Sequence, residues 1–288
     1  MRLLALDTST LTASVAALDT ETGALVERRQ RVTVHSDVLL ELVSAVLDEA
    51  GWNARSVEAV ACGAGPGSFT GLRIGLATAK GLAFGAGAKL VMVSSLAAMA
   101  ARVPGRVAAV LDAHKSEVYA GIFDVAGGLT TPVGAERIFS PARLAAELAT
   151  ESELGVVGDG AVRYPELVSG TARRIDDDGA PHAAEVARLA AARLAVGESD
   201  ALDTARPSYL RASEAEILKA ERATLKAVGD ESKRLEALRA EHAGLEVRLR
   251  ELDSHLALTT DEQAERTGLK KAKLQLKDDI AKLERSCS

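Results

Sequence analysis

The glycine-rich stretch at residues 62–81 is the most prominent candidate for chemistry in this sequence. An apolar strand is expected to enter it, and a helix is expected to begin near Ser68 or Thr70. Such a helix start can bind an anion through its free N–H groups, or its small residues can pack against a partner. The spacing does not fit a Walker A phosphate loop, because Lys80 precedes Gly81 instead of following a glycine. We therefore favour packing.

Two aspartates and a second glycine segment are weaker candidates. Asp7 and Asp112 each end an apolar segment and could form an acid–base pair, but duplication of one unit explains their equivalence, so we interpret both as structural. The glycines at 155–160 could approach a phosphate, but Asp159 would repel it unless a cation intervened. Ser68 has no histidine nearby in sequence to act as its base. We expect no catalytic residue and no cofactor.

The histidines do not form a recognisable metal site. Two ligands on one helical face require a spacing of three or four residues. No pair has this spacing among the five histidines, which are His35, His114, His182, His242 and His255. We therefore expect no metal, and we expect His35 or Ser36 to cap the start of a helix instead.

The elements that would position these residues follow the order βββαβα, approximately repeated. Expected strands of the first unit lie at 2–6, 13–18, 24–34, 57–62 and 90–93, and expected helices end at 51, 85 and 101. The second unit has expected strands at 106–112, 117–123, 136–139 and 154–157, and helices at 141–150 and 181–196. This order predicts a mixed α/β body with two lobes, at 1–103 and 104–212, before a charged helical segment at 213–288.

Composition limits the class of protein. The 288 residues carry a net charge of −6, which disfavours unaided binding to nucleic acid. The two cysteines, Cys62 and Cys287, cannot make a disulfide framework and fit a reducing cytoplasm. Asp7 interrupts the apolar start, and no apolar run approaches membrane-spanning length. We expect a soluble cytoplasmic protein without membrane contact.

Several motifs together resemble the TsaB (YeaZ) family. The longest is Gly-Pro-Gly-Ser-Phe-Thr-Gly-Leu-Arg at 65–73, and others lie at 3–9, 93–96, 117–120 and 207–211. The resemblance covers about residues 1–212 and implies the actin-like, ribonuclease-H-like (ASKHA) fold for both lobes. It implies a non-catalytic scaffold subunit of the machinery that places threonylcarbamoyl on N6 of adenosine 37 in tRNA. The implied partners are a homologous catalytic subunit (TsaD-like) and a small ATPase (TsaE-like), with tRNA bound only through the complex.

The expected partner surface lies on the two helices that flank the glycine stretch. Small residues there would let a partner helix approach closely, in a complex with the catalytic subunit or in a homodimer. The residues expected on this surface are Leu39, Leu42, Val43, Val46, Leu72, Arg73, Leu76, Ala79, Lys80 and Ala83. Two alternatives are a stand-alone actin-like enzyme, either a metallopeptidase or an ATPase, and an interaction protein dominated by its C-terminal helices.

The C-terminal segment at 213–288 is predicted to form two helices. It holds 15 Lys or Arg and 16 Asp or Glu among its 76 residues, with no aromatic side chain. Leucines at heptad spacing predict an antiparallel hairpin or coiled coil, with a possible interruption at Gly229 and Asp230. The part at 235–285 resembles short helical-hairpin proteins of the YdcH-like group. Its lysines at 270–277 fit a solvated face better than tRNA contacts, and its thin core favours docking or self-association.

Overall fold

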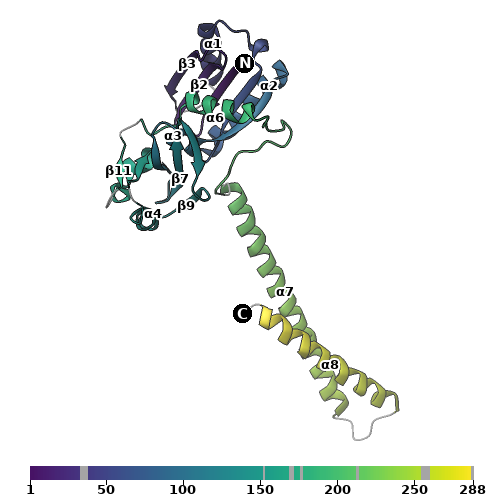
Figure 1. Cartoon of the computed structure of the whole chain (residues 1–288). Coiled ribbons are helices and arrows are strands. Elements are labelled where there is room, and N and C mark those ends of the chain that lie inside the picture. Colours follow the sequence, from purple (N-terminus) through teal and green to yellow (C-terminus); the bar gives the residue numbers. More distant parts are fainter. Residues whose placement is uncertain are drawn as a thin grey trace. The chain divides into compact units, whose positions relative to one another are not determined.

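The computed structural model describes residues 1–32, 38–151, 153–168, 172–175, 178–211, 214–253 and 260–286. The chain divides into two compact units, Met1–Arg211 and Ala212–Ser288, which we call the body and the tail. Each unit has its own arrangement of elements (Figure 1).

The first sheet of the body has five strands in the order β3-β2-β1-β4-β5. Its strands are β1 (Arg2–Asp7), β2 (Thr12–Asp19), β3 (Leu25–Arg31), β4 (Ala59–Gly65) and β5 (Lys89–Ser94). Strand β1 alternates its faces, because Leu4 and Leu6 join one core cluster while Leu3 and Ala5 join the other. Both faces of β1 are therefore buried, as its apolar sequence predicts.

The second sheet repeats the local pattern of the first. Its main order is β11-β10-β6-β7-β8, and β9 also pairs with β7. The central strand β6 is antiparallel to β7 and parallel to β10, just as β1 is antiparallel to β2 and parallel to β4. The strands are β6 (Gly105–Asp112), β7 (Val118–Ala126), β8 (Leu129–Pro132), β9 (Arg137–Phe139), β10 (Gly155–Val157) and β11 (Arg173–Arg174). This equivalence matches the internal repeat in the sequence.

Helices cover the two sheets in layers (Figure 1). Helices α1 (Leu39–Ala50) and α2 (Phe69–Ala86) pack on the outer face of the first sheet, where both contribute to one core cluster. Helices α3 (Ser95–Ala100) and α6 (Ala183–Ala195) contribute to the cluster shared by both sheets. Helices α4 (Pro141–Leu148) and α5 (Asp159–Arg163) lie on the second sheet, and short 3-10 turns occupy Ala54–Ser56 and Pro165–Leu167. The body has the two-lobed actin-like architecture that the motifs implied.

The tail consists of helices α7 (Glu214–Asp253) and α8 (Thr260–Ser286). Their antiparallel pairing is marked by ion pairs between the helices, Arg248 with Glu265 at 2.9 Å and Asp253 with Arg266 at 2.6 Å. Helix α7 continues without a break through positions 229 and 230, where the sequence indicated a possible interruption. The predicted hairpin is confirmed, and the interruption is not.

Some element boundaries differ from those expected. The strand expected at 24–34 is shorter, and β8, β11 and α5 were not predicted because each is too short to show a hydrophobic period. Val38 is the N-cap residue of α1, and the expected caps, His35 and Ser36, lie outside the described residues. No helix in the described part of the chain is long and apolar enough to cross a membrane.

Candidate partner interface

The glycine stretch joins β4 to α2 and packs inward against the turn after β1. Ser68 caps α2, because its Oγ accepts a hydrogen bond from the N–H of Gly71 at 3.2 Å. The N–H of Ser68 donates to the carbonyl of Ser9 at 2.7 Å. Gly67 has a φ of 156°, and a Cβ built there would lie 2.2 Å from that same carbonyl oxygen. The N–H groups of Ser68 and Gly71 are thus committed to the protein itself, which favours packing over an anion site.

Asp7 is fully buried, and its carboxylate accepts hydrogen bonds from Ser9 and Ser95. Oδ1 accepts from the N–H and the Oγ of Ser9, at 2.8 and 2.6 Å, and Oδ2 accepts from the Oγ of Ser95 at 2.7 Å. The Ser95 Oγ in turn accepts from the N–H of Gly65 at 3.2 Å. The carboxylate therefore joins β1, β4 and the start of α3, which is a structural role.

Asp112 holds the equivalent turn in the second lobe. Its Oδ1 accepts from the N–H of His114 at 3.1 Å, two residues later, as that of Asp7 does from Ser9. Its Oδ2 lies 3.3 Å from the Nε of Arg163. The N–H of Asp112 donates to Asp159, whose pKa is raised mainly by burial. These contacts fit the structural interpretation of the aspartates.

Cys62 is the cysteine within the glycine stretch, and its side chain is buried. Burial, and then the nearby charge of Asp7, raise the pKa of the thiol far above its usual range. A thiol that stays protonated is a poor nucleophile. Within the described residues, no group of three or more His, Cys, Asp or Glu side chains is placed to share a metal ion.

Most of the side chains expected on the partner surface lie in the core of this chain. Eight of the ten are at most 8% exposed, namely Leu39, Leu42, Val43, Val46, Leu72, Leu76, Ala79 and Ala83. Arg73 is exposed and Lys80 is partly buried. Most residues of the expected set therefore lie on the core-facing side of α1 and α2, because apolar periodicity indicates the side of a helix that contacts the sheet.

The outward side of the same helices carries small residues and two large apolar ones. Phe84 on α2 is 82% exposed and Leu40 on α1 is 63% exposed. Gly81 and Gly85 flank Phe84 on the exposed side of α2, and a Cβ built on either would have no neighbouring atom within 4 Å among the residues that the structure describes. We call Leu40, Ala77, Gly81, Phe84 and Gly85 the outer face. Sequence reasoning noted the small residues of this helix but could not separate the exposed Ala77 and Gly81 from the others, which are buried.

An aromatic stack borders the start of α2. The ring centroids of Phe69 and Tyr209 are 4.9 Å apart, and the guanidinium carbon of Arg73 lies 3.9 Å from the Phe69 centroid. The Nε of Arg73 donates to the Tyr209 hydroxyl at 3.1 Å. This stack fixes residues 207–211 against the first lobe.

The same C-terminal residues of the body also contact the second lobe. The N–H of Ser208 donates to the carbonyl of Ala64 at 2.7 Å, on the first lobe. Arg211 donates to the carbonyl of Ala113 at 2.7 Å and pairs with Glu117, on the second. Residues 207–211 therefore form a strap that holds both lobes.

Comparison with known proteins agrees with this fold. Residues 29–219 match the family model "TsaD: tRNA N6-adenosine threonylcarbamoyltransferase". Residues 235–284 match a family of unknown function, DUF465, over the helical hairpin.

Individual relatives match this chain over different lengths. The tRNA threonylcarbamoyladenosine biosynthesis protein TsaB of Escherichia coli is 35% identical over 73% of this chain and 95% of its own length. TsaB of Haemophilus influenzae is 42% identical over 41% of this chain and 52% of its own. The structure of YeaZ from Pseudomonas aeruginosa is 35% identical, with a TM-score of 0.66 over 73% of this chain and 99% of that one. With its glycine signature, its two repeated sheets and an alignment that covers nearly the full length of the Escherichia coli and Pseudomonas aeruginosa relatives, the chain belongs to the TsaB (YeaZ) family, which takes part in tRNA threonylcarbamoyladenosine biosynthesis.

Proposed function

We propose that this chain is a non-catalytic scaffold subunit in the synthesis of N6-threonylcarbamoyladenosine at position 37 of tRNA. Its outer face would bind a homologous catalytic subunit of the TsaD type. The observation that carries this proposal is the exposure of Gly81, Phe84 and Gly85 together on one side of α2.

The energetics of α2 favour an external use for these residues. A glycine in a helix interior costs about 1 kcal/mol relative to alanine. At Gly81 and Gly85 no described residue of the body would meet an added Cβ, so internal packing among these residues does not account for glycine there. A helix of another protein could approach α2 closely at these positions, with Phe84 as its apolar anchor.

A homologous partner suits this surface because it would present an equivalent helix pair. Helices α1 and α2 of this chain and their counterparts would then pack as a bundle of four. The chemistry would belong to the catalytic subunit, the ATPase of the TsaE type would join the pair, and tRNA would bind only through the complex. This work on tRNA would take place in the cytoplasm. Without its partner, the outer face would bind a second copy of the body.

The proposal is tested by measuring affinity for the catalytic subunit of the same organism. We expect Gly81→Gln and Phe84→Asp each to raise the Kd at least tenfold, about 1.4 kcal/mol. Val196→Asp is the matched control, since Val196 is 75% exposed and lies outside α1 and α2. Unchanged affinity of folded Gly81 and Phe84 variants would contradict the proposed interface.

The non-catalytic assignment has its own test. Purified chain is assayed for modified adenosine with tRNA, ATP and an activated threonylcarbamoyl donor, with and without the catalytic and ATPase subunits. We expect product only from the full set. Product from this chain alone would show that it is an enzyme.

A further inference from the structure

The helical hairpin of the tail leaves part of its apolar surface uncovered. Leu249 and Leu252 are buried, whereas Leu245 and Leu276 are only partly buried and Leu274 is 62% exposed. Two helices bury apolar side chains only where they face each other, and stable bundles add further helices across the open sides. The described part of the hairpin therefore has the surface of an incomplete bundle.

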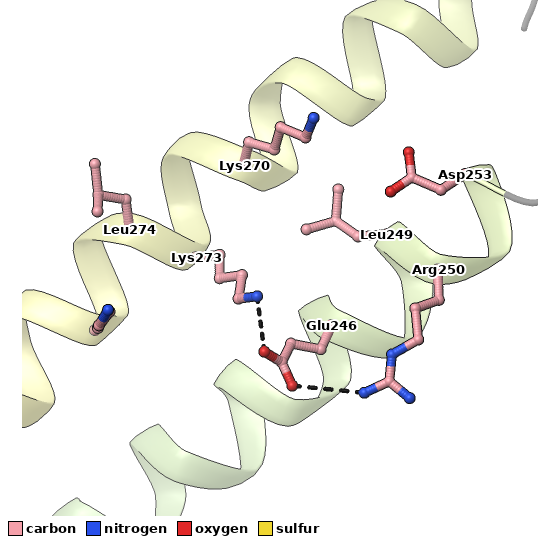
Figure 2. Close-up of a pocket in the computed structure, with 8 residues that line it drawn as sticks. Glu246, Leu249, Arg250, Asp253, Lys270, Lys273 and Leu274 are labelled. Carbon is pink, nitrogen blue, oxygen red and sulfur yellow. Dashed lines mark ion pairs between the residues drawn. The ribbon is translucent and has the colours of Figure 1, made fainter.

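A groove of about 380 Å³ lies on one open side, between α7 and α8 (Figure 2). Figure 2 shows Leu249 between the two helices, with Lys270 and Leu274 on α8. The residues that line the groove are Glu246, Leu249, Arg250, Asp253, Lys270, Lys273, Leu274 and Lys277. The lining combines leucine side chains with an excess of cations.

Both carboxylates of the groove already have partners. Glu246 lies 2.7 Å from the Nζ of Lys273 and 3.7 Å from Arg250 (Figure 2). The hydrogen bond from Lys273 is the main reason that the pKa of Glu246 is lowered. Asp253 lies 2.6 Å from Arg266. These carboxylates therefore do not offset the other cations of the groove.

Two lysines of the groove remain available. Lys270 and Lys277 are exposed and form no ion pair with any residue of the chain that the structure describes. A suitable occupant offers an apolar side chain for the leucines and a carboxylate for these lysines. On a helix, the two groups would lie one turn apart.

Helix α8 itself carries this combination. Leu274 and Asp278 are four residues apart and so share one face, and Asp278 is exposed without an ion pair among the described residues. A two-fold axis beside Leu274 would place Asp278 of each copy opposite Lys270 of the other, because both lie four residues from Leu274. Such a contact is self-complementary, as a two-fold interface requires.

We propose that the occupant of this groove is the α8 helix of a second copy of this chain. Leu274 of each copy enters the groove of the other and packs on Leu249, while Asp278 and Lys270 pair across the axis. The two hairpins form a four-helix bundle. This contact lies wholly in the tail and does not depend on the proposed function of the body.

Disulfide cross-linking of the full-length chain tests this contact separately from any association of the body. All variants carry Cys287→Ser, and the remaining native cysteine, Cys62, is buried. We expect Leu274→Cys to give a disulfide-linked dimer on oxidation. Val247→Cys is the matched control, because Val247 is 55% exposed on α7 but does not line the groove. No cross-link through Leu274→Cys, or an equal yield from Val247→Cys, would overturn the proposal.

A charge exchange tests the pairing itself. In the Leu274→Cys background, Lys270→Glu is expected to lower the cross-linked fraction at least threefold, and adding Asp278→Lys is expected to restore it. Helix content by circular dichroism confirms that each variant is folded. Failure of the double exchange to restore the cross-link would contradict this register.

Discussion

Gly75 of α2 lies directly against Thr8, in the turn after β1. The Thr8 hydroxyl donates to the carbonyl of Gly71 at 2.8 Å. A Cβ built on Gly75 would lie 2.2 Å from the Oγ1 of Thr8. The helix can approach the turn this closely only because position 75 has no side chain. Gly75 thus has an internal reason to be glycine, which Gly81 lacks.

The two glycines should respond oppositely to alanine. We expect Gly75→Ala to lower the free energy of unfolding by about 1–3 kcal/mol through overpacking. We expect Gly81→Ala to raise it by up to about 1 kcal/mol, since alanine favours the helix. Urea denaturation measures both values. A shift of the same sign in both variants would contradict this distinction.

The core was more predictable from sequence than the partner surface. Periodic leucines and valines on α1 and α2 report the side that faces the sheet, so Leu42 and Leu76, which were expected on the partner surface, are buried in the core. The outer face consists largely of glycine and alanine, which give no periodic apolar signal. The exposure of Phe84 depends on where the sheet lies, which one residue cannot reveal.

Long-range polar contacts were also beyond sequence reasoning. A structural role for Asp7 was predicted from the repeat, but its partner Ser95 lies 88 positions away in the chain. The sheet brings these residues together, because β4 lies between β1, which ends at Asp7, and β5, after which α3 begins at Ser95. The tail hairpin was predictable because its heptad pattern is local and long.

The buried carboxylate of Asp7 should matter for stability. Asp7→Asn keeps one acceptor oxygen but presents an NH2 group among hydroxyl and amide donors. We expect the free energy of unfolding to fall by about 1–3 kcal/mol, the cost of unsatisfied buried groups. Chemical denaturation measures the change, and affinity for the catalytic subunit is measured on the folded fraction. Full stability with lost tRNA modification in the reconstituted complex would instead indicate a direct role in the reaction.

The strap should stabilise the body through its aromatic stack. Tyr209→Phe removes only the hydrogen bond from Arg73 and is expected to cost about 0.5–1.5 kcal/mol of unfolding free energy. Tyr209→Ala also removes the contact with Phe69 and should cost more, because stacked rings add about 0.5–1.5 kcal/mol beyond burial. Thermal unfolding of the two variants and the native chain shows which variant loses more stability. Equal melting temperatures for Tyr209→Ala and the native chain would show that the strap does not contribute to stability.

His182 lies where the lobes meet, before α6, and is surrounded by charged groups. Its Nε2 is 2.7 Å from a guanidinium nitrogen of Arg102 and 2.6 Å from one of Arg29, and Asp178 and Glu27 are also close. Burial first, and then the charge of Arg102, lower the pKa of His182 to about 4. The folded protein therefore keeps this ring neutral at pH values where an unfolded chain would protonate it.

The stability of the body should therefore fall on mild acidification. An unfolded histidine has a pKa near 6.5, so between about pH 6.5 and 4 the unfolded state binds more protons than the folded state. The contribution of His182 to the free energy of unfolding is complete above this window. It is lost as the pH falls through the window, on the order of 2–3 kcal/mol in all. Urea denaturation between pH 4.5 and 7.5 measures this dependence. His182→Asn should flatten the curve, whereas His114→Asn should not, because the His114 side chain is 86% exposed. An unchanged pH dependence in His182→Asn would assign the acid sensitivity to other groups, such as the buried carboxylates.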